Sequence, residues 1–200
     1  MEDPEQDPGV RAMLAYQAGD EAAFDELVRS YSGQVYALLS RFLGPVPARE
    51  DLVQEVFLRV VRARERYKPS ARFSTWLYRI AFNLCVNERE RLSGRVEVSL
   101  EAPGEGGLDG GPPGALADGT AAGPSEELER ADAVAAVRAA SAALPETQRM
   151  ALLLAKYEEL SHAEIALVMG SSEKAIKSLI HRARENLRGA LRAFLQEDAA

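Results

Sequence analysis

Several residue types are scarce in this sequence of 200 residues, and each scarcity excludes a class of protein. The single cysteine cannot form an internal disulfide, so nothing points to an oxidising compartment. No apolar run approaches the roughly 18 residues that span a bilayer, and the acidic start lacks the basic and apolar regions of a signal peptide. Aromatic residues make up only 6% of the chain, which favours helices over sheets. We therefore expect a helical, cytoplasmic protein with no membrane insertion of its own.

Residues that form catalytic or metal centres are equally scarce. The two histidines, His162 and His181, lack the spacing of a zinc motif such as HExxH. Cys85 lies between apolar neighbours in an expected helix, which is typical of a packed thiol rather than a nucleophile. The phosphate-binding GxxxxGK[ST] and dinucleotide-binding GxGxxG motifs are both missing. We expect no enzyme activity, no metal and no cofactor.

The net charge of −7 conceals strong differences along the chain. Residues 1–28 and 96–132 are acidic, whereas residues 58–95 carry ten basic and three acidic side chains. Residues 174–192 carry six basic side chains and one acidic side chain. Because local charge governs what a surface binds, the two basic blocks are candidate surfaces for nucleic acid.

Apolar residues recur at helical spacing over most of the chain, and no strand pattern is found. The pattern predicts helices at about 20–43, 49–66, 74–92, 126–143, 145–158, 162–168 and 173–195. Asp20, Ser161 and Ser172 are suitable N-caps, and Pro145 suits the first position of a helix. The predicted fold class is all-α.

A change of composition divides the chain. Residues 101–125 are rich in glycine, proline and alanine and have almost no large apolar side chains. Such a segment cannot bury enough surface to offset its ordering entropy. We expect two small helical domains, residues 10–95 and 126–196, joined by a flexible, acidic Gly/Pro-rich linker at residues 96–125.

The second domain contains the pattern of a DNA-binding helix-turn-helix. A short helix at 162–168, a turn with Gly170 and a longer basic helix at 173–195 follow in the required order. Basic and polar residues share one face of the longer helix, where they can bind phosphates and read base edges. The predicted DNA-binding residues are Ser172, Lys174, Lys177, Ser178, Arg182 and Arg184. The alternative is an ordinary helical hairpin with a solvated charged surface.

Aromatic and basic residues alternate between residues 66 and 82. Rings stack on unpaired bases while cations follow the backbone, as binding to single-stranded nucleic acid requires. Tyr67 and Phe73 flank a loop and are the better stacking candidates, whereas the pattern favours a place in the core for Trp76. Asn83, one turn after Arg79, can hydrogen-bond to a base edge.

Three stretches together resemble the extracytoplasmic-function (ECF) sigma factors of bacterial RNA polymerase. Residues 51–60, DLVQEVFLRV, resemble the family's core-binding helix. Residues 64–91 resemble its promoter-melting segment, in which FSTWLYRIAFN is the most specific part. Residues 144–188 resemble its C-terminal helix-turn-helix. The match covers nearly everything from about residue 11 to residue 195 except the linker.

The resemblance implies a role for each group of residues. The clamp of core RNA polymerase would be bound by Asp51, Gln54, Glu55 and Phe57, and the flap would be a further contact. The promoter element near minus ten would be melted and bound by Tyr67, Arg72, Phe73, Trp76, Arg79 and Asn83. A flipped-out base would lie beside Tyr67 and Asn83. The helix that begins at Ser172 would read the element near minus thirty-five of promoters in a stress- or signal-responsive regulon. An anti-sigma factor, held against or between the two domains, is the further partner implied.

The recognition helix departs from the family pattern, which usually reads V-G-T-V-K-S-R. Here the stretch is EKAIKSL, so Lys174, Ala175 and Leu179 differ from the family's Gly, Thr and Arg. The resemblance therefore implies polymerase binding more firmly than any particular promoter sequence. A stand-alone helix-turn-helix regulator, whose N-terminal half dimerises or senses a ligand, is the alternative. It would bind duplex DNA tightly without polymerase.

Overall fold

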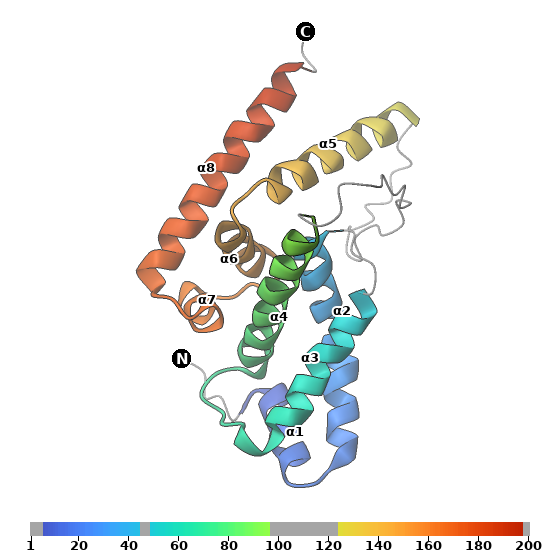
Figure 1. The fold of residues 1–200 in the computed structure, drawn as a ribbon, viewed down its shortest axis with the longest axis vertical. Coiled ribbons are helices and arrows are strands. Elements are labelled where there is room, and N and C mark those ends of the chain that lie inside the picture. The colour runs from blue at the N-terminus through green and yellow to red at the C-terminus, as the bar shows by residue number, and fades with distance from the viewer. Residues whose placement is uncertain (1–5, 45–48, 97–123, 198–200) are drawn as a thin grey trace.

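The computed structural model describes residues 6–44, 49–96 and 124–197. Eight α-helices and no strand occur in these ranges, which confirms the all-α prediction (Figure 1). Most of the predicted linker, residues 97–123, lies outside the described residues. At its edges Val96 ends one helix and Pro124 begins another. The proposed division into two domains stays a prediction, and we refer below to an N-terminal and a C-terminal half.

The N-terminal half consists of α1 (Pro8–Gln17), α2 (Glu21–Leu43), α3 (Arg49–Ala63) and α4 (Phe73–Val96). Asp20 caps α2 as expected, because its carboxylate accepts a hydrogen bond from the Ala22 N–H at 3.0 Å. Helix α1 was not predicted, although Asp7 followed by Pro8 is a local start signal for it in the sequence. Its carboxylate cap is Asp7, which accepts from the Val10 N–H at 2.8 Å. This additional helix changes the surroundings of the loop before α4, as described below.

The C-terminal half consists of α5 (Pro124–Ala142), α6 (Glu146–Tyr157), α7 (His162–Met169) and α8 (Glu173–Glu197). Pro145 occupies the N-cap position of α6 rather than its first helical position. Ser161 is the N-cap of α7 as predicted, and together with Glu164 it forms a capping box. Gly170 ends α7 in the left-handed conformation, with φ of 61°, and this tight turn leads directly into α8.

The two halves are packed on one another, with α7 against α4 and α6 against α2 (Figure 1). One hydrophobic cluster runs through both halves: it includes Phe42 and Leu77 from the first and Met150 and Leu154 from the second, all fully buried. This docking was not indicated by the expected flexible linkage. No helix in the described part of the chain is long and apolar enough to cross a membrane.

Candidate nucleic-acid interface

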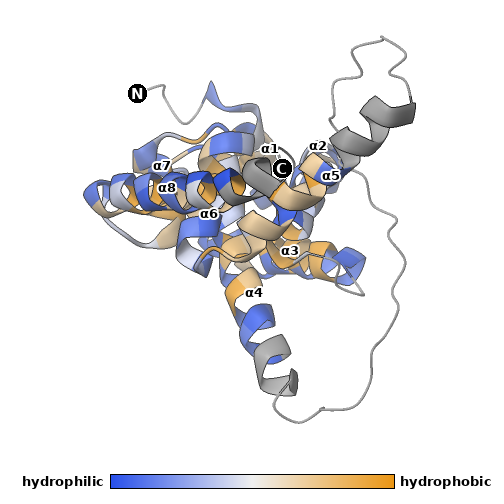
Figure 2. Cartoon of the chain, turned by 90° about the horizontal axis from the view of Figure 1, so that it is seen from above, coloured by the Kyte–Doolittle hydropathy of each residue, from blue (hydrophilic) through white to orange (hydrophobic). Residues whose placement is uncertain are grey.

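The basic face of α8 is open to solvent, as its sequence pattern predicted. Ile176, Ile180 and Ala183 are buried and hold the helix against the rest of the C-terminal half. The opposite face carries the exposed side chains Ser172, Lys174, Lys177, Ser178, Arg182 and Arg184. In Figure 2, α8 runs along the outside of the protein and most of its visible length is hydrophilic. A helix with one buried apolar stripe and one exposed basic face can lie in the major groove of DNA.

The start of α8 is held in place by local interactions. The Ser172 hydroxyl accepts a hydrogen bond from the Ala175 N–H at 3.2 Å and so caps the helix. Lys177 Nζ lies 2.9 Å from Glu173 Oε1, and the hydrogen bond from Lys177 lowers the pKa of Glu173. Ala166 of α7 is buried, and its small side chain allows α7 to support α8 at short range. The first turns of α8 are therefore fixed by a serine cap, an ion pair and the packing of α7.

The three atypical positions of this helix have different surroundings. Lys174 is exposed, while Ala175 and Leu179 are half-buried. Leu179 packs against the hydrophobic cluster instead of presenting a cation to solvent. At position 179 the family pattern has an arginine that could contact DNA, and this chain has a leucine that packs against the protein instead.

The structure does not expose Tyr67 and Phe73 for the predicted stacking on a base, and this role stays a prediction. Only 5% of Tyr67 and none of Phe73 is exposed, so neither ring offers a face to a base. The two rings pack edge to face with centroids 6.3 Å apart, and Tyr67 also contacts the half-buried Trp76 at 4.9 Å. Tyr31 of α2 completes the cluster, 5.0 Å from Phe73. These aromatic residues form core rather than a nucleic-acid platform.

The unpredicted helix α1 explains this burial. A Cβ placed on Gly9 would lie 2.8 Å from Phe73 Cβ, so only glycine lets α1 approach this closely. At the other end of α1, Gln17 Nε2 donates to the backbone carbonyl of Arg64 at 2.9 Å and that of Tyr67 at 3.3 Å. Helix α1 thereby covers the loop that precedes α4. The Tyr67 hydroxyl has no hydrogen-bond partner among the described residues, and burial raises the pKa of Tyr67 to about 12.

The polar residues predicted to contact DNA, in α4 and directly before it, are on the surface. Arg72, Arg79 and Asn83 are all exposed. Asn83 lines a shallow pocket together with Phe82, Val86 and Asn87 of α4 and Glu146 and Thr147 of α6. The predicted pairing of Tyr67 with Asn83 around one base is not found, because Tyr67 is buried near the start of α4 and does not line this pocket.

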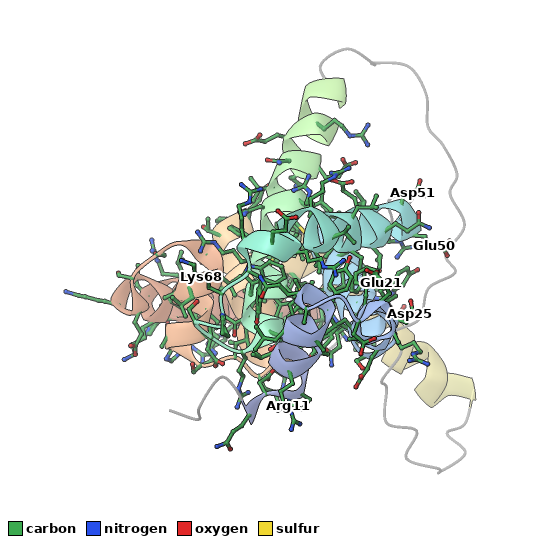
Figure 3. All side chains as sticks on the ribbon, turned by 90° about the horizontal axis from the view of Figure 1, so that it is seen from below. Arg11, Glu21, Asp25, Glu50, Asp51 and Lys68 are labelled. Carbon is green, nitrogen blue, oxygen red and sulfur yellow. The ribbon has the colours of Figure 1, made fainter. Side chains whose placement is uncertain are left out.

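The first half of α3 presents a polar face to solvent. Asp51 and Gln54 are exposed, and Figure 3 shows Asp51 and its neighbour Glu50 pointing away from the protein. Glu55 is half-buried: Arg59 Nε donates to its carboxylate at 2.9 Å, and this hydrogen bond lowers the pKa of Glu55. Phe57 is 6% exposed and packs against Phe24, so it supports the helix from beneath.

Two apolar residues on the same helix were missed by sequence reasoning. Leu58 is 49% exposed and Val61 is 39% exposed. Their spacing from Gln54, four and seven residues, places all three on one face of α3. That spacing was visible in the sequence and could have identified the face as a protein contact, because apolar side chains on an otherwise polar face are typical of such surfaces.

Comparisons with known proteins agree with this arrangement. The sigma-70 region 2 family matches residues 27–95, which include α3 and α4, and the sigma-70 region 4 family matches residues 135–187, which include the helix-turn-helix. The structure also resembles CnrH solved in complex with the cytosolic domain of CnrY, with a TM-score of 0.63, 25% identity, and coverage of 96% of this chain and 99% of that one. The sigma factor RpoE of Bartonella quintana, solved with the anti-sigma factor NepR, shares the fold with a TM-score of 0.65, 19% identity, and coverage of 84% and 96%.

Relatives that match nearly the whole chain point to one family. The RNA polymerase sigma-H factor of Pseudomonas aeruginosa is 34% identical over 181 residues, which is 90% of this chain and 92% of the relative. The ECF RNA polymerase sigma factor SigW of Bacillus subtilis is 32% identical, with coverage of 87% and 91%. The ECF RNA polymerase sigma-E factor of Escherichia coli K12 is 36% identical, with coverage of 84% and 86%. These matches confirm the resemblance and do not favour a stand-alone regulator: the chain belongs to the ECF sigma factors of the sigma-70 family.

Proposed function

We propose that this chain is a promoter-specificity subunit of bacterial RNA polymerase, acting in the cytoplasm. It binds the core enzyme, recognises promoter DNA and opens it without catalysing a covalent step. The observation that carries the proposal is the presence of both sigma-70 regions in one chain whose relatives it matches over almost their full length. The geometry supports it, because each region presents an exposed polar or basic face.

The basic face of α8 is the proposed reader of the minus-thirty-five element. Lysine and arginine side chains bind phosphates and fix the register, while Ser178 and Arg182 lie near enough to the start of the helix to reach base edges. Compared with the family pattern, Lys174 adds a cation where glycine is usual, and Leu179 removes one where arginine is usual. We expect strong phosphate binding and an altered base preference.

The exposed side chains of α4 are the proposed contacts for the minus-ten element. Arg72 and Arg79 supply positive charge for the backbone of an unpaired strand, and Asn83 supplies a donor and an acceptor for a base edge. Tyr67 and Phe73 hold the loop and the start of α4 in position. Opening follows from affinity, because a surface that binds single-stranded DNA more tightly than duplex shifts the equilibrium toward the melted form.

The exposed face of α3 is the proposed contact with the polymerase clamp. Asp51 and Gln54 provide its polar part, and Leu58 and Val61 provide apolar area that the sequence analysis did not include. Glu55, fixed by Arg59, and the buried Phe57 keep the helix in position. Since CnrH and RpoE were solved with CnrY and the anti-sigma factor NepR, an anti-sigma factor is a further proposed partner.

Reconstitution tests the proposal. Purified chain is mixed with core RNA polymerase and a promoter from its own genomic neighbourhood, and promoter-dependent transcripts are measured. We expect a stable complex and transcripts, and Leu58→Asp should abolish complex formation while leaving the fold intact. Tight binding to duplex DNA without polymerase, with no complex and no transcripts, would instead support a stand-alone regulator.

A further inference from the structure

One side chain of α1 holds the segment that leads from α3 to α4. The amide nitrogen Nε2 of Gln17, the last residue of α1, lies 2.9 Å from the backbone carbonyl oxygen of Arg64. It also lies 3.2 Å from the carbonyl oxygen of Glu65 and 3.3 Å from that of Tyr67. An amide nitrogen carries two N–H groups, so the three carbonyls share two donors. A single side chain therefore fixes the backbone at the point where the loop before α4 begins.

These carbonyls need a donor from outside their own segment. Helix α3 ends at Ala63 and is followed by η2 (Arg64–Arg66), a single turn of 3-10 helix. The last carbonyls of a helix have no partner within that helix. Gln17 supplies donors to them from a distant part of the chain. Its amide nitrogen must be the atom that faces η2, because its amide oxygen would repel three carbonyl oxygens.

The Arg64 side chain is held by the same corner of the fold. Its guanidinium group lies over the ring of Tyr16, 4.1 Å from the ring centroid, and its Nη1 lies 2.8 Å from Glu21 Oε1 at the start of α2. Between α1 and α2 the chain turns through Gly19, whose φ of 110° favours glycine. We call Tyr16, Gln17 and Glu21 the α1–α2 corner. This corner holds both the backbone and the side chain of Arg64.

The loop that starts at this corner presents cations to solvent. Residues 67–72 lead directly into α4, and within them Lys68 and Arg72 are exposed. Tyr67 and Phe73, at the two ends of the loop, are buried and pack against one another. Figure 1 shows α1 beside the segment that joins α3 to α4. Gln17 is therefore a polar contact at the entrance of the loop, next to the surface of α4 proposed to bind DNA.

The order of this loop matters for binding an unpaired strand. A single strand has no fixed shape, and a loop that becomes ordered only on binding weakens the affinity further. We propose that Gln17 is a positioning residue for promoter opening, which holds residues 67–72 in the conformation that places Lys68 and Arg72 along the unpaired strand. This inference rests on the proposed function of α4. Gln17 is half-buried and acts on the strand through the three carbonyls that it holds.

The test variant is Gln17→Met, which keeps the length of the side chain and removes both N–H donors. We expect open complexes to become about tenfold less stable, with binding to polymerase and to the minus-thirty-five duplex unchanged. Permanganate reactivity of promoter thymines measures opening in the reconstituted holoenzyme. Co-purification and gel shifts measure the two binding steps. A role in stability alone would lower opening and both binding steps together.

Trp76 reports the order of the loop in the absence of DNA. It is the only tryptophan in the chain, it is half-buried, and its ring centroid lies 4.9 Å from that of Tyr67. When Gln17 no longer holds the Tyr67 carbonyl, the Tyr67 ring covers Trp76 less completely. Acrylamide should therefore quench the fluorescence of the free Gln17→Met chain about twofold faster, because the loop opens locally more often.

Two further variants separate the donors of Gln17 from stability in general. The matched control is Gln148→Met: Gln148 Oε1 accepts a hydrogen bond from Asn186 Nδ2 at 2.9 Å, so the same substitution removes a side-chain hydrogen bond in the C-terminal half. This control should leave the quenching of Trp76 and promoter opening unchanged. Gln17→Lys keeps N–H donors on a side chain of different shape, and it should restore slow quenching and most of the opening.

Several outcomes would overturn the proposal. If Trp76 is quenched equally fast in Gln17→Met and in the unaltered chain, Gln17 does not hold the loop. If quenching accelerates but open complexes are as stable as before, opening does not depend on the order of the loop. Equal defects in Gln17→Met and Gln148→Met would assign the effect to stability, and equal defects in Gln17→Met and Gln17→Lys would assign it to side-chain shape.

Failure of the proposed function is distinguishable from failure of this inference. A holoenzyme containing the unaltered chain that opens no promoter contradicts the proposed function. The quenching measurement needs neither DNA nor polymerase, so it shows in either case whether Gln17 holds the loop.

Discussion

Helices α4 and α8 both carry a basic block, yet they meet their surroundings differently. The basic side chains of α8 are exposed to solvent. Helix α4, by contrast, packs against α1 and α2 and against α7 of the C-terminal half. Charge along the chain identified both helices as candidate nucleic-acid surfaces. It did not distinguish an open surface from a covered one, because covering depends on distant segments. The comparison shows that two helices with similar charge patterns differ in how many neighbouring helices they pack against.

The largest expected effect is a loss of stability on substitution in the aromatic cluster beneath α1. Phe73→Ala removes a fully buried ring beneath α1 and should lower the free energy of unfolding by about 3–5 kcal/mol. Thermal or urea denaturation measures this loss. Phe73→Leu retains most of the apolar volume and should keep near-normal affinity for single-stranded DNA. A large loss of that affinity in the well-folded leucine variant would show that the ring contacts a base after all.

The next largest effect is expected on binding of duplex DNA by the exposed basic face of α8. Arg182→Ala should weaken binding of the minus-thirty-five duplex by roughly 1–3 kcal/mol if this side chain reads a base, and unfolding should hardly change because the residue is exposed. Gel shifts of the holoenzyme at several salt concentrations provide the measurement. Arg192→Ala, near the other end of α8, is the matched control. Equal losses for both variants would indicate general charge attraction rather than base reading.

A smaller effect is expected inside the pocket shared by α4 and α6. Asn83→Ala should weaken open-complex formation by about 1–2 kcal/mol, a factor of roughly five to thirty, and leave polymerase binding unchanged. Permanganate reactivity of promoter thymines reports strand opening, and co-purification reports polymerase binding. Asn87 lines the same pocket one turn later, so Asn87→Ala is the control. Equal loss of opening and of polymerase binding would contradict the base-contact role of Asn83.

The smallest effect is a pH dependence of docking. The pKa of Glu158 is raised in the docked form, so docking strengthens as the pH falls through that raised value and weakens above it. The groups that face this carboxylate are Tyr78 from α4 and Arg41 from α2, and neither changes charge in this range. The radius of gyration should increase gradually with pH. Glu158→Gln should reduce this dependence, and an identical profile for the variant would assign it to other groups.

The parts of the fold that follow local rules could be predicted from the sequence. Asp20, Ser161 and Gly170 mark helix ends through their own side chains or backbone conformation, and the period of apolar residues defines the buried face of α8. Helix α1 was not predicted although Asp7 and Pro8 mark its start; its position is tertiary, because only glycine at position 9 lets it approach Phe73 this closely. The burial of Tyr67 and Phe73 follows from the same helix and was missed with it.

The packing of the two halves on one another could not be predicted for a related reason. Neither Tyr78 nor Glu158 lies in a sequence motif that would indicate a hydrogen bond between them. The two residues are 80 positions apart, and helical periodicity relates only residues within one helix. The charge pattern gave no indication either, because α6 carries one acidic and two basic side chains and α7 carries one acidic side chain. Only the structure brings these carboxylates to α4, where they oppose the basic block that the charge pattern had identified.

The burial of Arg149 has an evolutionary consequence. A methionine or leucine of similar size would fill the same space above Phe42 without leaving guanidinium nitrogens unpaired, and replacing buried charges in this way often makes proteins more stable. Arg149 thus makes the packing of the C-terminal half on Phe42 weaker than an apolar side chain of that size would. Selection for stability alone would replace this arginine, so its presence indicates that weaker packing of the two halves is tolerated.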